Sequence, residues 1–417
     1  MILIVEKIKS FLKDLDYYVL IPTLGLCLLG LVSIFSATYT DAEDINFTKQ
    51  ISFFGIGIVL MLAVILIPIR LIDSASLTFY AIMLVLLVFV LLFGPVRYGA
   101  KRWIALGPLS LQPSELAKVA TILTVARMLA LQRINASSLY NIILSIALVS
   151  VPMFLVFREP DLGTALCIGC VALPMLFWHG ISWFSIFVMF SPLVTVLIHI
   201  GSGYNFDFFI ATLFLILVVL YFSKRSAKMI LVVLMINVVV GLGSEPLWDS
   251  LKDYQKERIL TFLDPERDAK GAGYQVLQSQ IAIGSGGLLG KGYLEGSQTQ
   301  LHFMPEQHTD FIFSALAEEF GFAGSVILLA LFAILIVRII MIADVVDDKF
   351  SSLTLIGIAS LFTFQVLVNI GMTTGIMPVT GIPLPFLSYG GTALLTNLLL
   401  VGIVLNIAMR KKVYDIH

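Results

Sequence analysis

Charged residues are scarce in this 417-residue chain, in which Asp, Glu, Lys and Arg together make up only 13%. Ordinary soluble proteins carry about 25%. Hydrophobic residues make up 59% and the mean hydropathy is +1.00, which is more apolar surface than a soluble core can bury. Segments that alternate apolar and polar residues, the pattern of a membrane β-barrel, are missing as well. The composition therefore predicts an all-α polytopic membrane protein.

Cysteine is almost as scarce, and charge of neither sign predominates. Three cysteines are too few for a disulfide framework, and Cys167 and Cys170 lie in an apolar run where small residues suit helix packing. The 26 Lys and Arg nearly balance the 27 Asp and Glu, for a net charge of −1. The chain therefore lacks the basic surface that binds nucleic acid, and no nucleic-acid partner is expected.

Long apolar runs are abundant, and twelve can be counted as helices able to cross a bilayer about 30 Å thick. The fourth is the weakest, since it holds charged residues such as Glu115 and Lys118. We expect one transmembrane domain over residues 17–410, preceded by an interfacial segment at 1–16 and followed by a tail at 411–417. The runs lie near residues 17–37, 50–69, 75–94, 112–132, 140–157, 161–178, 182–200, 206–222, 228–245, 309–337, 353–372 and 389–408.

The distribution of Lys and Arg predicts the orientation, because short cytoplasmic loops of membrane proteins are enriched in these residues. When the N-terminus is placed in the cytoplasm, the inner segments hold most of the Lys and Arg found in short connections. Both termini are therefore expected to be cytoplasmic, and the long loop 246–308 to be extracytoplasmic. Arg97, Lys101 and Arg102 form a local exception, which is either tolerated or binds an anionic, membrane-bound substrate.

Polar residues concentrate in four segments, the first of which covers residues 101–118. Pro113 suits the first turn of a helix, and Glu115 and Lys118 are three residues apart on one helical face. Charges at membrane depth are costly unless they pair or line a wet cavity. These two residues therefore either form a structural ion pair, or Lys118 faces a cavity and contacts phosphate or a catalytic carboxylate.

The second segment covers residues 158–164, at the entry of another apolar run. Asp161 follows a proline there, where a carboxylate can cap the free N–H groups of a helix and suits the helix dipole. Capping is therefore a sufficient explanation for Asp161. Arg158 has no such local role and is available to bind an anion.

The third segment is the long loop itself. Gly290 and Lys291 do not complete a phosphate-binding loop, because Ser285 and Gly292 stand where that motif needs Gly and Ser or Thr. The polar residues near the end of the loop match no dense zinc motif, although a hard cation shared with substrate phosphates is compatible with them. They are His302, Glu306, His308 and Asp310.

Asp310 stands where the tenth apolar run begins. Thr309 or Asp310 can cap that helix, and the helix dipole would keep the Asp310 carboxylate ionised. Two turns deeper, Glu318 and Glu319 are neighbours and cannot both face one cavity. At least one of them is expected to hydrogen-bond to a neighbouring helix.

The fourth segment lies between the last two apolar runs and includes Asn369 and residues 377–391. Its three prolines and several glycines cannot continue a helix. Irregular backbone at membrane depth is tolerated where it lines a cavity. We therefore expect a re-entrant loop near residues 373–388 that closes the outer face of such a cavity.

Together these segments resemble the SEDS family (shape, elongation, division and sporulation) over about residues 17–410. Within it the likeness is to the RodA branch, which serves elongation, since Pro383 stands where FtsW-like chains tend to have Thr. The family has ten spans, so two of the twelve, in a hairpin within 201–247, look inserted. The motifs are Gln112-Pro113-Ser114-Glu115, Pro160-Asp161-Leu162-Gly163-Thr164, Gly271-Ala272-Gly273-Tyr274-Gln275, Pro305-Glu306-Gln307-His308-Thr309-Asp310 and Pro383-Leu384-Pro385-Phe386-Leu387-Ser388-Tyr389-Gly390-Gly391.

The resemblance implies a peptidoglycan glycosyltransferase that polymerises lipid II in the bacterial inner membrane. Inversion at the donor carbon then calls for one displacement with a general base on the acceptor hydroxyl. Asp310 matches the family's catalytic carboxylate and is assigned as that base. The residues expected to bind substrate are Lys118, Glu115, Arg102, Trp103, Ser114, Arg158, Gln280, His308 and Ser388.

Family membership also implies partners: a class B penicillin-binding protein that cross-links the strands, other proteins of the elongation complex, and membrane lipids. A divalent cation, Mg or Mn, would bridge the pyrophosphate, although the sequence shows no dedicated metal site. A lipid II flippase is the main alternative, and a scaffold is a third. A flippase should carry polar residues through both leaflets, often with internal repeats.

Overall fold

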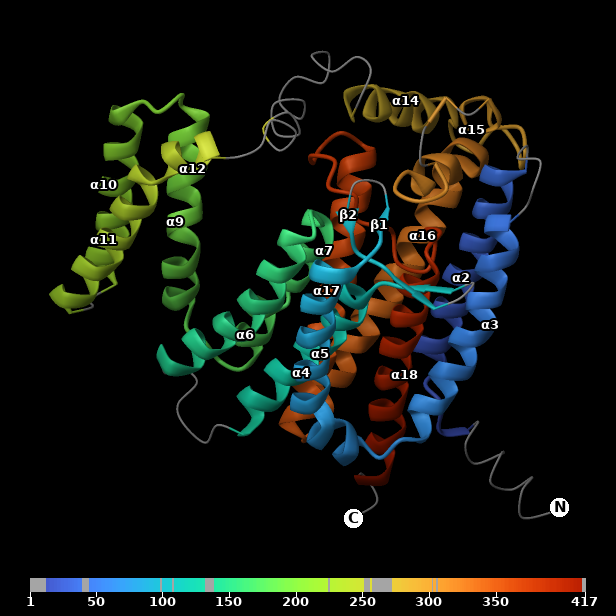
Figure 1. The fold of residues 1–417 in the computed structure, drawn as a ribbon, viewed down its shortest axis with the longest axis horizontal. Helices are drawn as coiled ribbons and strands as arrows, with labels where there is room; N and C mark the ends of the chain where they lie inside the picture. The colour runs from blue at the N-terminus through green and yellow to red at the C-terminus, as the bar shows by residue number, and fades with distance from the viewer. Residues whose placement is uncertain are drawn as a thin grey trace.

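The computed structural model describes residues 13–39, 45–97, 100–106, 109–131, 139–223, 226–250, 256, 272–301, 303–304 and 307–414. Helices dominate these residues and form a main bundle with a smaller helical unit beside it (Figure 1). The helical fold predicted from composition is confirmed. Residues 1–12 of the predicted interfacial segment (1–16) lie outside the described part of the chain.

The main bundle contains helices from both halves of the chain. Asp16 begins the first of them, because its side chain accepts a hydrogen bond from the Tyr18 amide at the free helix end. The last helix continues to Tyr414, so the predicted tail at 411–417 begins as helix. The bundle consists of α2 (Tyr17–Thr38), α3 (Ile45–Leu66), α4 (Ile69–Phe93), α5 (Pro113–Leu131), α6 (Leu139–Arg158), α7 (Leu162–Gly169), α8 (Ala172–Trp178), α16 (Ile312–Val345), α17 (Lys349–Thr373) and α18 (Gly391–Tyr414).

The helices show that this is a multi-pass membrane protein. Within the described residues, eight helices are long and apolar enough to cross a bilayer, and three shorter apolar helices accompany them. The remaining predicted span, α5, carries the charges noted in the sequence. The start of α2 and the end of α18 lie at the same end of the bundle (Figure 1). Every apolar run thus forms helix, while the number of crossings stays a prediction.

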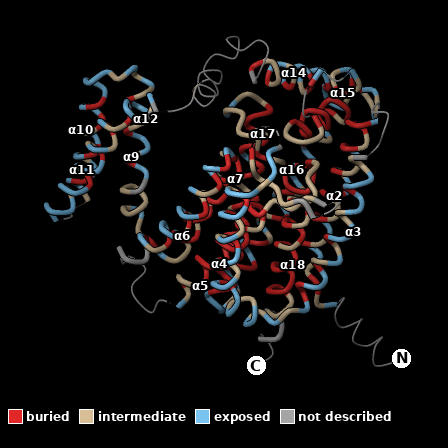
Figure 2. Tube along the Cα trace, in the orientation of Figure 1, coloured by how far each residue is buried: buried red, intermediate tan, exposed pale blue. Residues whose placement is uncertain are grey.

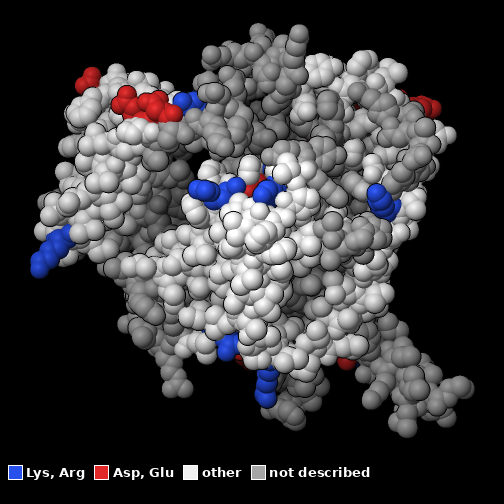
Figure 3. Space-filling model, viewed as in Figure 1, with Lys and Arg blue, Asp and Glu red and all other residues white. Residues whose placement is uncertain are grey.

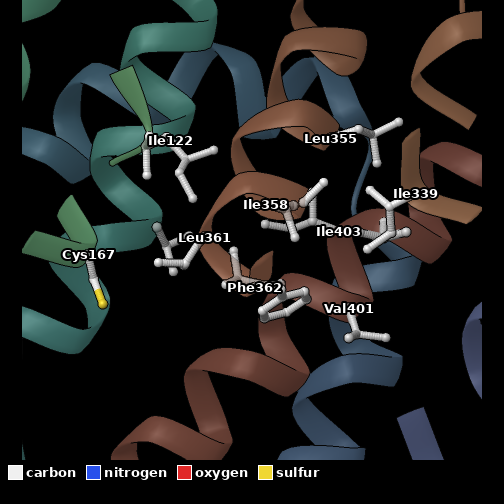
Figure 4. Close-up of a cluster of buried hydrophobic side chains, with 14 of the residues drawn as sticks. Ile122, Cys167, Ile339, Leu355, Ile358, Leu361, Phe362, Val401 and Ile403 are labelled. Atoms are coloured by element: carbon white, nitrogen blue, oxygen red, sulfur yellow. The ribbon is translucent and has the colours of Figure 1, made fainter. Parts of the chain in front are cut away.

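The hydrophobic core centres on α17 and α18. About three quarters of the most apolar stretch in each is buried, 72% in α17 and 78% in α18, against 28% in α3 and α4. Figure 2 shows the buried residues gathered inside the main bundle. Leu361 and Phe362 of α17 are fully buried and pack with side chains of α5, α7, α16 and α18 (Figure 4). The loops at either end of α17 are therefore attached to one of the most buried helices of the molecule.

Two short hairpins between α4 and α5 are an addition to the helical prediction. Strand β1 (Val96–Arg97) pairs with β2 (Ala100–Lys101), and β3 (Ile104–Leu106) pairs with β4 (Leu109–Leu111). Strands of two or three residues are too short to produce an alternating pattern that sequence could reveal. They carry Lys101, Arg102 and Trp103 between the end of α4 and the start of α5.

The smaller unit contains the predicted hairpin of residues 201–247. Its helices are α9 (Trp183–Gly201), α10 (Phe206–Phe222), α11 (Ala227–Leu242) and α12 (Ser244–Ser250). The hairpin packs on α9, where Asn237 is fully buried and hydrogen-bonds with Thr195 and Ser191. Amides and hydroxyls of this kind join helices in membranes. Whether the hairpin is an insertion stays a prediction.

The predicted loop 246–308 is partly helical. Helices α14 (Ala272–Ser285) and α15 (Ser297–Gln300) lie at the end of the bundle opposite to the start of α2 (Figure 1). Ser279 fixes α14 in place by bonding to the Ser314 hydroxyl at 2.5 Å and the Thr373 carbonyl at 2.6 Å. Residues 257–271, His302 and Glu306 lie outside the described part of the chain.

The neighbouring carboxylates Glu318 and Glu319 both reach other segments, as the sequence predicted for at least one of them. Glu318 accepts bonds from Lys291 at 2.7 Å and from the first amides of α15. Glu319 accepts a bond from the Ser36 hydroxyl of α2. Lys291 is therefore engaged in an ion pair with Glu318.

Helix α16 is broken at Gly321, which has φ +64° and ψ −159°. The turn at 286–292 enters this break, and its backbone satisfies the groups that the break leaves open. The approach is close, since a Cβ added at Gly290 would lie 2.0 Å from the Glu319 carbonyl oxygen. The bridging bonds are Lys291 N to Glu318 O, Gly292 N to Glu319 O, Phe322 N to Gly287 O and Ala323 N to Leu288 O, at 2.9–3.1 Å.

Gly290→Ala is expected to lower the unfolding midpoint, because the new Cβ overlaps backbone and the residue has φ +84°. The cost should be about 1–3 kcal/mol. Gly284→Ala is the matched control, since nothing lies within 4 Å of its added Cβ and it sits in α14. That control should be neutral or slightly stabilising. Equal midpoints for the two purified variants in a thermal scan would contradict the backbone bridge.

Candidate active site

Asp310 lies two residues before the start of α16, on a segment that contacts the loop between α17 and α18. The N-cap of α16 is Phe311, so neither Thr309 nor Asp310 occupies the capping position that the sequence allowed. The carboxylate faces the loop: a Cβ added at Gly381 would lie 3.4 Å from Asp310 Oδ2. Gly381 has φ +70°, which favours glycine, so the loop can bring its bare backbone against the carboxylate.

The predicted re-entrant loop is the non-helical stretch 374–390 between α17 and α18. It packs against the segment that carries Asp310 through two backbone-directed contacts. The Ser388 hydroxyl donates to the Thr309 carbonyl at 2.6 Å, and the Tyr389 amide donates to the His308 carbonyl at 2.9 Å. A further bond comes from α17, where the Asn369 side-chain amide donates to the Asp310 carbonyl at 2.9 Å. The loop and the segment before α16, about 80 residues apart in sequence, are thus held together.

The start of α7 touches the same loop. A Cβ added at Gly163 would lie 2.8 Å from the Thr380 carbonyl oxygen and 3.0 Å from that of Gly381. Asp161 caps α7, accepting bonds from the Thr164 amide and hydroxyl, so its predicted capping role is confirmed. It also accepts a bond from Gln112. The loop therefore has Asp310 on one side and the first turn of α7 on another.

Beyond α7 lies the charged face of α5. Lys118 Nζ and Glu115 Oε2 are 2.8 Å apart and both side chains are almost fully buried. Asp161 is near enough to Lys118 to interact with it electrostatically. Ser114, also buried, has a hydroxyl without a hydrogen-bond partner among the described residues. The predicted ion pair between Glu115 and Lys118 therefore exists, and it lies within electrostatic range of the carboxylate that caps α7.

The predicted cations at the rim have different surroundings. Arg102 donates to the backbone carbonyls of Glu159 and Pro160, so it braces the turn before α7. Arg158 is exposed at the end of α6, and Trp103 is partly exposed between the hairpins. On the face drawn in Figure 3, charged groups of the main bundle lie above its middle and at its lower end, with an uncharged band between them. Any role of these cations in substrate binding stays a prediction.

The other predicted substrate residues hold the re-entrant loop. Gln280 donates to the Thr374 carbonyl at 2.9 Å, at the start of the loop. The His308 ring lies 5.6 Å from that of Tyr389. Ser388 accepts a bond from the Leu384 amide, in addition to its bond with Thr309. The structure thus brings Gln280, His308 and Ser388 to the loop beside Asp310, and Ser114, Glu115 and Lys118 to α5.

Glu159 is a buried carboxyl in the turn before α7. The residue is 1% exposed, and neither carboxyl oxygen has a hydrogen-bond partner among the described residues. Burial raises its pKa to about 8, Asp161 adds to the rise, and Arg102 opposes it. The side chain is therefore largely protonated at neutral pH.

The protonation of Glu159 predicts a pH-dependent stability. Its folded-state pKa lies above the ordinary value of 4.5, so between about pH 4.5 and 8 the folded protein holds a proton that the unfolded chain has released. Stability is therefore lost as pH rises through this window. Relative to wild type, Glu159→Gln should gain roughly 2 °C or more in unfolding midpoint between pH 5 and pH 8.

Thermal scans of both proteins across that pH range provide the measurement. The exposed Glu245 of α12 offers the matched control, because Glu245→Gln should follow the wild-type curve at every pH. A midpoint difference between Glu159→Gln and wild type that stays constant from pH 5 to pH 8 would rule out the titration.

A family model described as "Cell cycle protein", covering the FtsW, RodA and SpoVE proteins, matches residues 17–208 and 205–413. The chain belongs to the SEDS family. It is 38% identical to the peptidoglycan glycosyltransferase MrdB of Escherichia coli K12 over 396 residues, which is 94% of each chain. It is 35% identical to the peptidoglycan glycosyltransferase RodA of Treponema pallidum, over 96% of this chain and 98% of the relative.

Solved structures of similar proteins agree with the fold of this SEDS protein. One, described as structural coordination of polymerization and crosslinking by a peptidoglycan synthase complex, has a TM-score of 0.73 and 30% identity. It covers 95% of this chain and 98% of that chain. The crystal structure of Thermus thermophilus RodA has a TM-score of 0.63 and 26% identity, covering 95% and 97%.

Asn369 and Gln112 contact residues of the site, Asp310 and Asp161 respectively, but the sequence did not predict these contacts. Both belong to the polar segments recognised in the SEDS protein's sequence, but neither was predicted to bind or position anything. For Asn369 a usable signal existed, because an amide within an apolar membrane helix usually has a partner across helices. For Gln112 no such signal existed, since loop residues are polar by default.

Proposed function

We propose that this SEDS protein polymerises lipid II into glycan strands during cell elongation, with Asp310 as the general base. The activity is that of a peptidoglycan glycosyltransferase, as in the relatives named for it. The observation that supports Asp310 is its carboxylate against the bare backbone of Gly381. The same loop backbone contacts Gly163 of α7, and Asp161, the N-cap of α7, is close enough to the buried Lys118 of α5 to interact with it electrostatically.

This arrangement suits an inverting glycosyl transfer. The Asp310 carboxylate would take the proton of the acceptor 4-hydroxyl as that oxygen attacks the donor carbon. The pyrophosphate leaves as an anion, so cationic stabilisation matters more than a proton donor. Lys118 is assigned to stabilise the negative charge of the pyrophosphate or to orient Asp310. Arg102 and Arg158 are assigned to bind the pyrophosphate at the rim of the site. The remaining residues proposed to bind substrate are Trp103, Ser114, Glu115, Gln280, His308 and Ser388.

The proposed location is the bacterial cytoplasmic membrane, with both termini in the cytoplasm. The bias of Lys and Arg in short loops supports this orientation. It would place α14, α15 and the re-entrant loop on the extracytoplasmic side, where glycan strands are made. The apolar outer surface of the bundle would keep the enzyme beside a substrate that never leaves the bilayer.

We further propose a class B penicillin-binding protein as the cross-linking partner, within a larger elongation complex. The support is that one similar structure is described as a peptidoglycan synthase complex with coordinated polymerization and crosslinking. A divalent cation, Mg or Mn, is proposed only as one carried by the substrate phosphates. Among the described residues no three His, Cys, Asp or Glu side chains converge as a metal ligand set, and no step is assigned to a protein-held ion.

Purified protein with its partner and lipid II provides the test. Glycan strands and released undecaprenyl pyrophosphate should accumulate with wild type and not with Asp310→Ala. The competing flippase would move lipid II across proteoliposome membranes without forming polymer, and it would not depend on Asp310. Translocation without polymer would therefore overturn the proposal.

A further inference from the structure

Asn369 is a fully buried amide in the mostly apolar last turns of α17. Placing such a group away from water is costly unless its hydrogens find acceptors. Its neighbours on α17 pack into the core around Phe362, so the helix holds the amide in a fixed place. Whatever Asn369 binds is therefore positioned by the most buried part of the bundle.

The two hydrogens of the Asn369 amide are used on two different segments. Nδ2 donates to the Asp310 carbonyl at 2.9 Å and to the Ile382 carbonyl at 2.8 Å. Ile382 directly follows Gly381, whose backbone faces the Asp310 carboxylate. One nitrogen thus connects the backbone of Asp310 to the loop backbone at residues 381–382, which lies against the side chain of Asp310.

The position of this bond matters because Asp310 precedes α16. The amides of Ser314 and Ala315 donate to the Phe311 carbonyl, so the regular hydrogen bonding of α16 begins one residue after Asp310. Asn369 fixes the carbonyl next to that point. The Asn369 amide holds the Asp310 carbonyl and the Ile382 carbonyl at a fixed separation. If the Asp310 backbone shifted, its carboxylate would therefore move relative to Gly381, the residue before Ile382.

We propose that Asn369 is a positioning residue that acts through Asp310, by holding the catalytic backbone and the re-entrant loop in one register. This inference rests on the proposed role of Asp310 as general base. Displacement of a reacting group by about 1 Å can cost about 10²-fold in rate. Loss of the bridge should therefore lower kcat while leaving substrate affinity, which other residues supply, nearly unchanged.

The chain contains a matched control in Asn406 of α18. That side chain is also fully buried, and its Nδ2 also donates to two backbone carbonyls, of Val64 and Ile67, each at 2.7 Å. These acceptors lie at the opposite end of α3 from Gln50, which bonds to the Gly390 amide of the re-entrant loop. Asn406 therefore has the same chemistry and burial without a connection to Asp310.

The test compares Asn369→Leu with Asn406→Leu, each purified with its partner and assayed over a range of lipid II concentrations. Both should lose thermal stability, because each leaves two carbonyls without their donor. Asn369→Leu should lower kcat by about 10–100-fold with KM within about 2-fold of wild type. Asn406→Leu should keep kcat within about 2-fold. If a Leu variant cannot be isolated, Asn369→Ala and Asn406→Ala also remove the donor without adding bulk or charge, and they give the same comparison.

Equal kcat values for the two variants, or a change confined to KM in Asn369→Leu, would overturn the proposal. Asp310→Ala is assayed beside them so that the two levels of inference can be separated. An active Asp310→Ala would reject the role of Asp310 itself. An inactive Asp310→Ala together with a normal kcat in Asn369→Leu would reject only the positioning role.

Discussion

Asp310→Ala and Asp310→Asn are expected to lower the rate of lipid II polymerisation by about 10²–10⁴-fold, the usual contribution of a general base. The Asn variant keeps the shape of the side chain and removes only its basicity. The N-cap residue of α16 is Phe311, so neither change replaces it. The protein should stay folded while polymer formation is lost.

The measurement is the rate of glycan-strand formation from purified lipid II with the partner present. Asp347→Asn is a suitable control, because Asp347 is exposed at the other end of α16. It should leave both rate and stability unchanged. Near wild-type polymerisation by Asp310→Asn would show that the base lies elsewhere, whereas a parallel loss of folding would point to a structural role for Asp310.

Lys118→Met is expected to have the second largest effect, lowering the rate per folded enzyme by about 10²-fold or more. The loss of one preorganised charge partner in an active site has this magnitude. The change also leaves Glu115 buried without its cation. Breaking a buried ion pair by removing one partner costs about 3–5 kcal/mol. A fall in activity alone would therefore not separate a catalytic from a structural role.

The double variant Lys118→Met/Glu115→Leu separates them. It removes both buried charges, and such replacements often restore stability. If Lys118 acts on substrate or on Asp310, stability should recover while the rate stays low. If the pair is only structural, the rate should recover as well. Arg127→Met, on the same helix and paired with Asp73 at 3.6 Å, serves as a control that should leave the rate unchanged.

The sequence could predict the helices because apolar length alone decides which segments enter a bilayer. It could also predict that Glu115 pairs with Lys118, since three residues of helix bring both to one face. The break in α16 could not be predicted from the sequence. Gly321 is one more glycine in an apolar run, and only the turn at 286–292 supplies the backbone hydrogen bonds that stabilise an interrupted helix there.

The predicted site residues show the same division. The motifs singled out Asp310, Lys118 and Ser388 because their residue types and order are unusual for membrane helices. Their order does not reveal that Ser388 braces the backbone at Thr309, or that Arg102 donates to the turn at Glu159. A hydrogen bond to a backbone carbonyl can be made by many side chains to any residue, so it leaves no pattern in the sequence.

By itself, the sequence determined a membrane protein of many helices, its family, and the few polar residues able to carry chemistry. It did so because the bilayer excludes charge and makes each exception informative. The tertiary structure alone decided how those residues meet. Asn369 on α17 joins Asp310 to Ile382 across 59 and 13 residues of chain, because core packing holds α17 between them. Such contacts depend on where helices cross, which hydropathy does not encode.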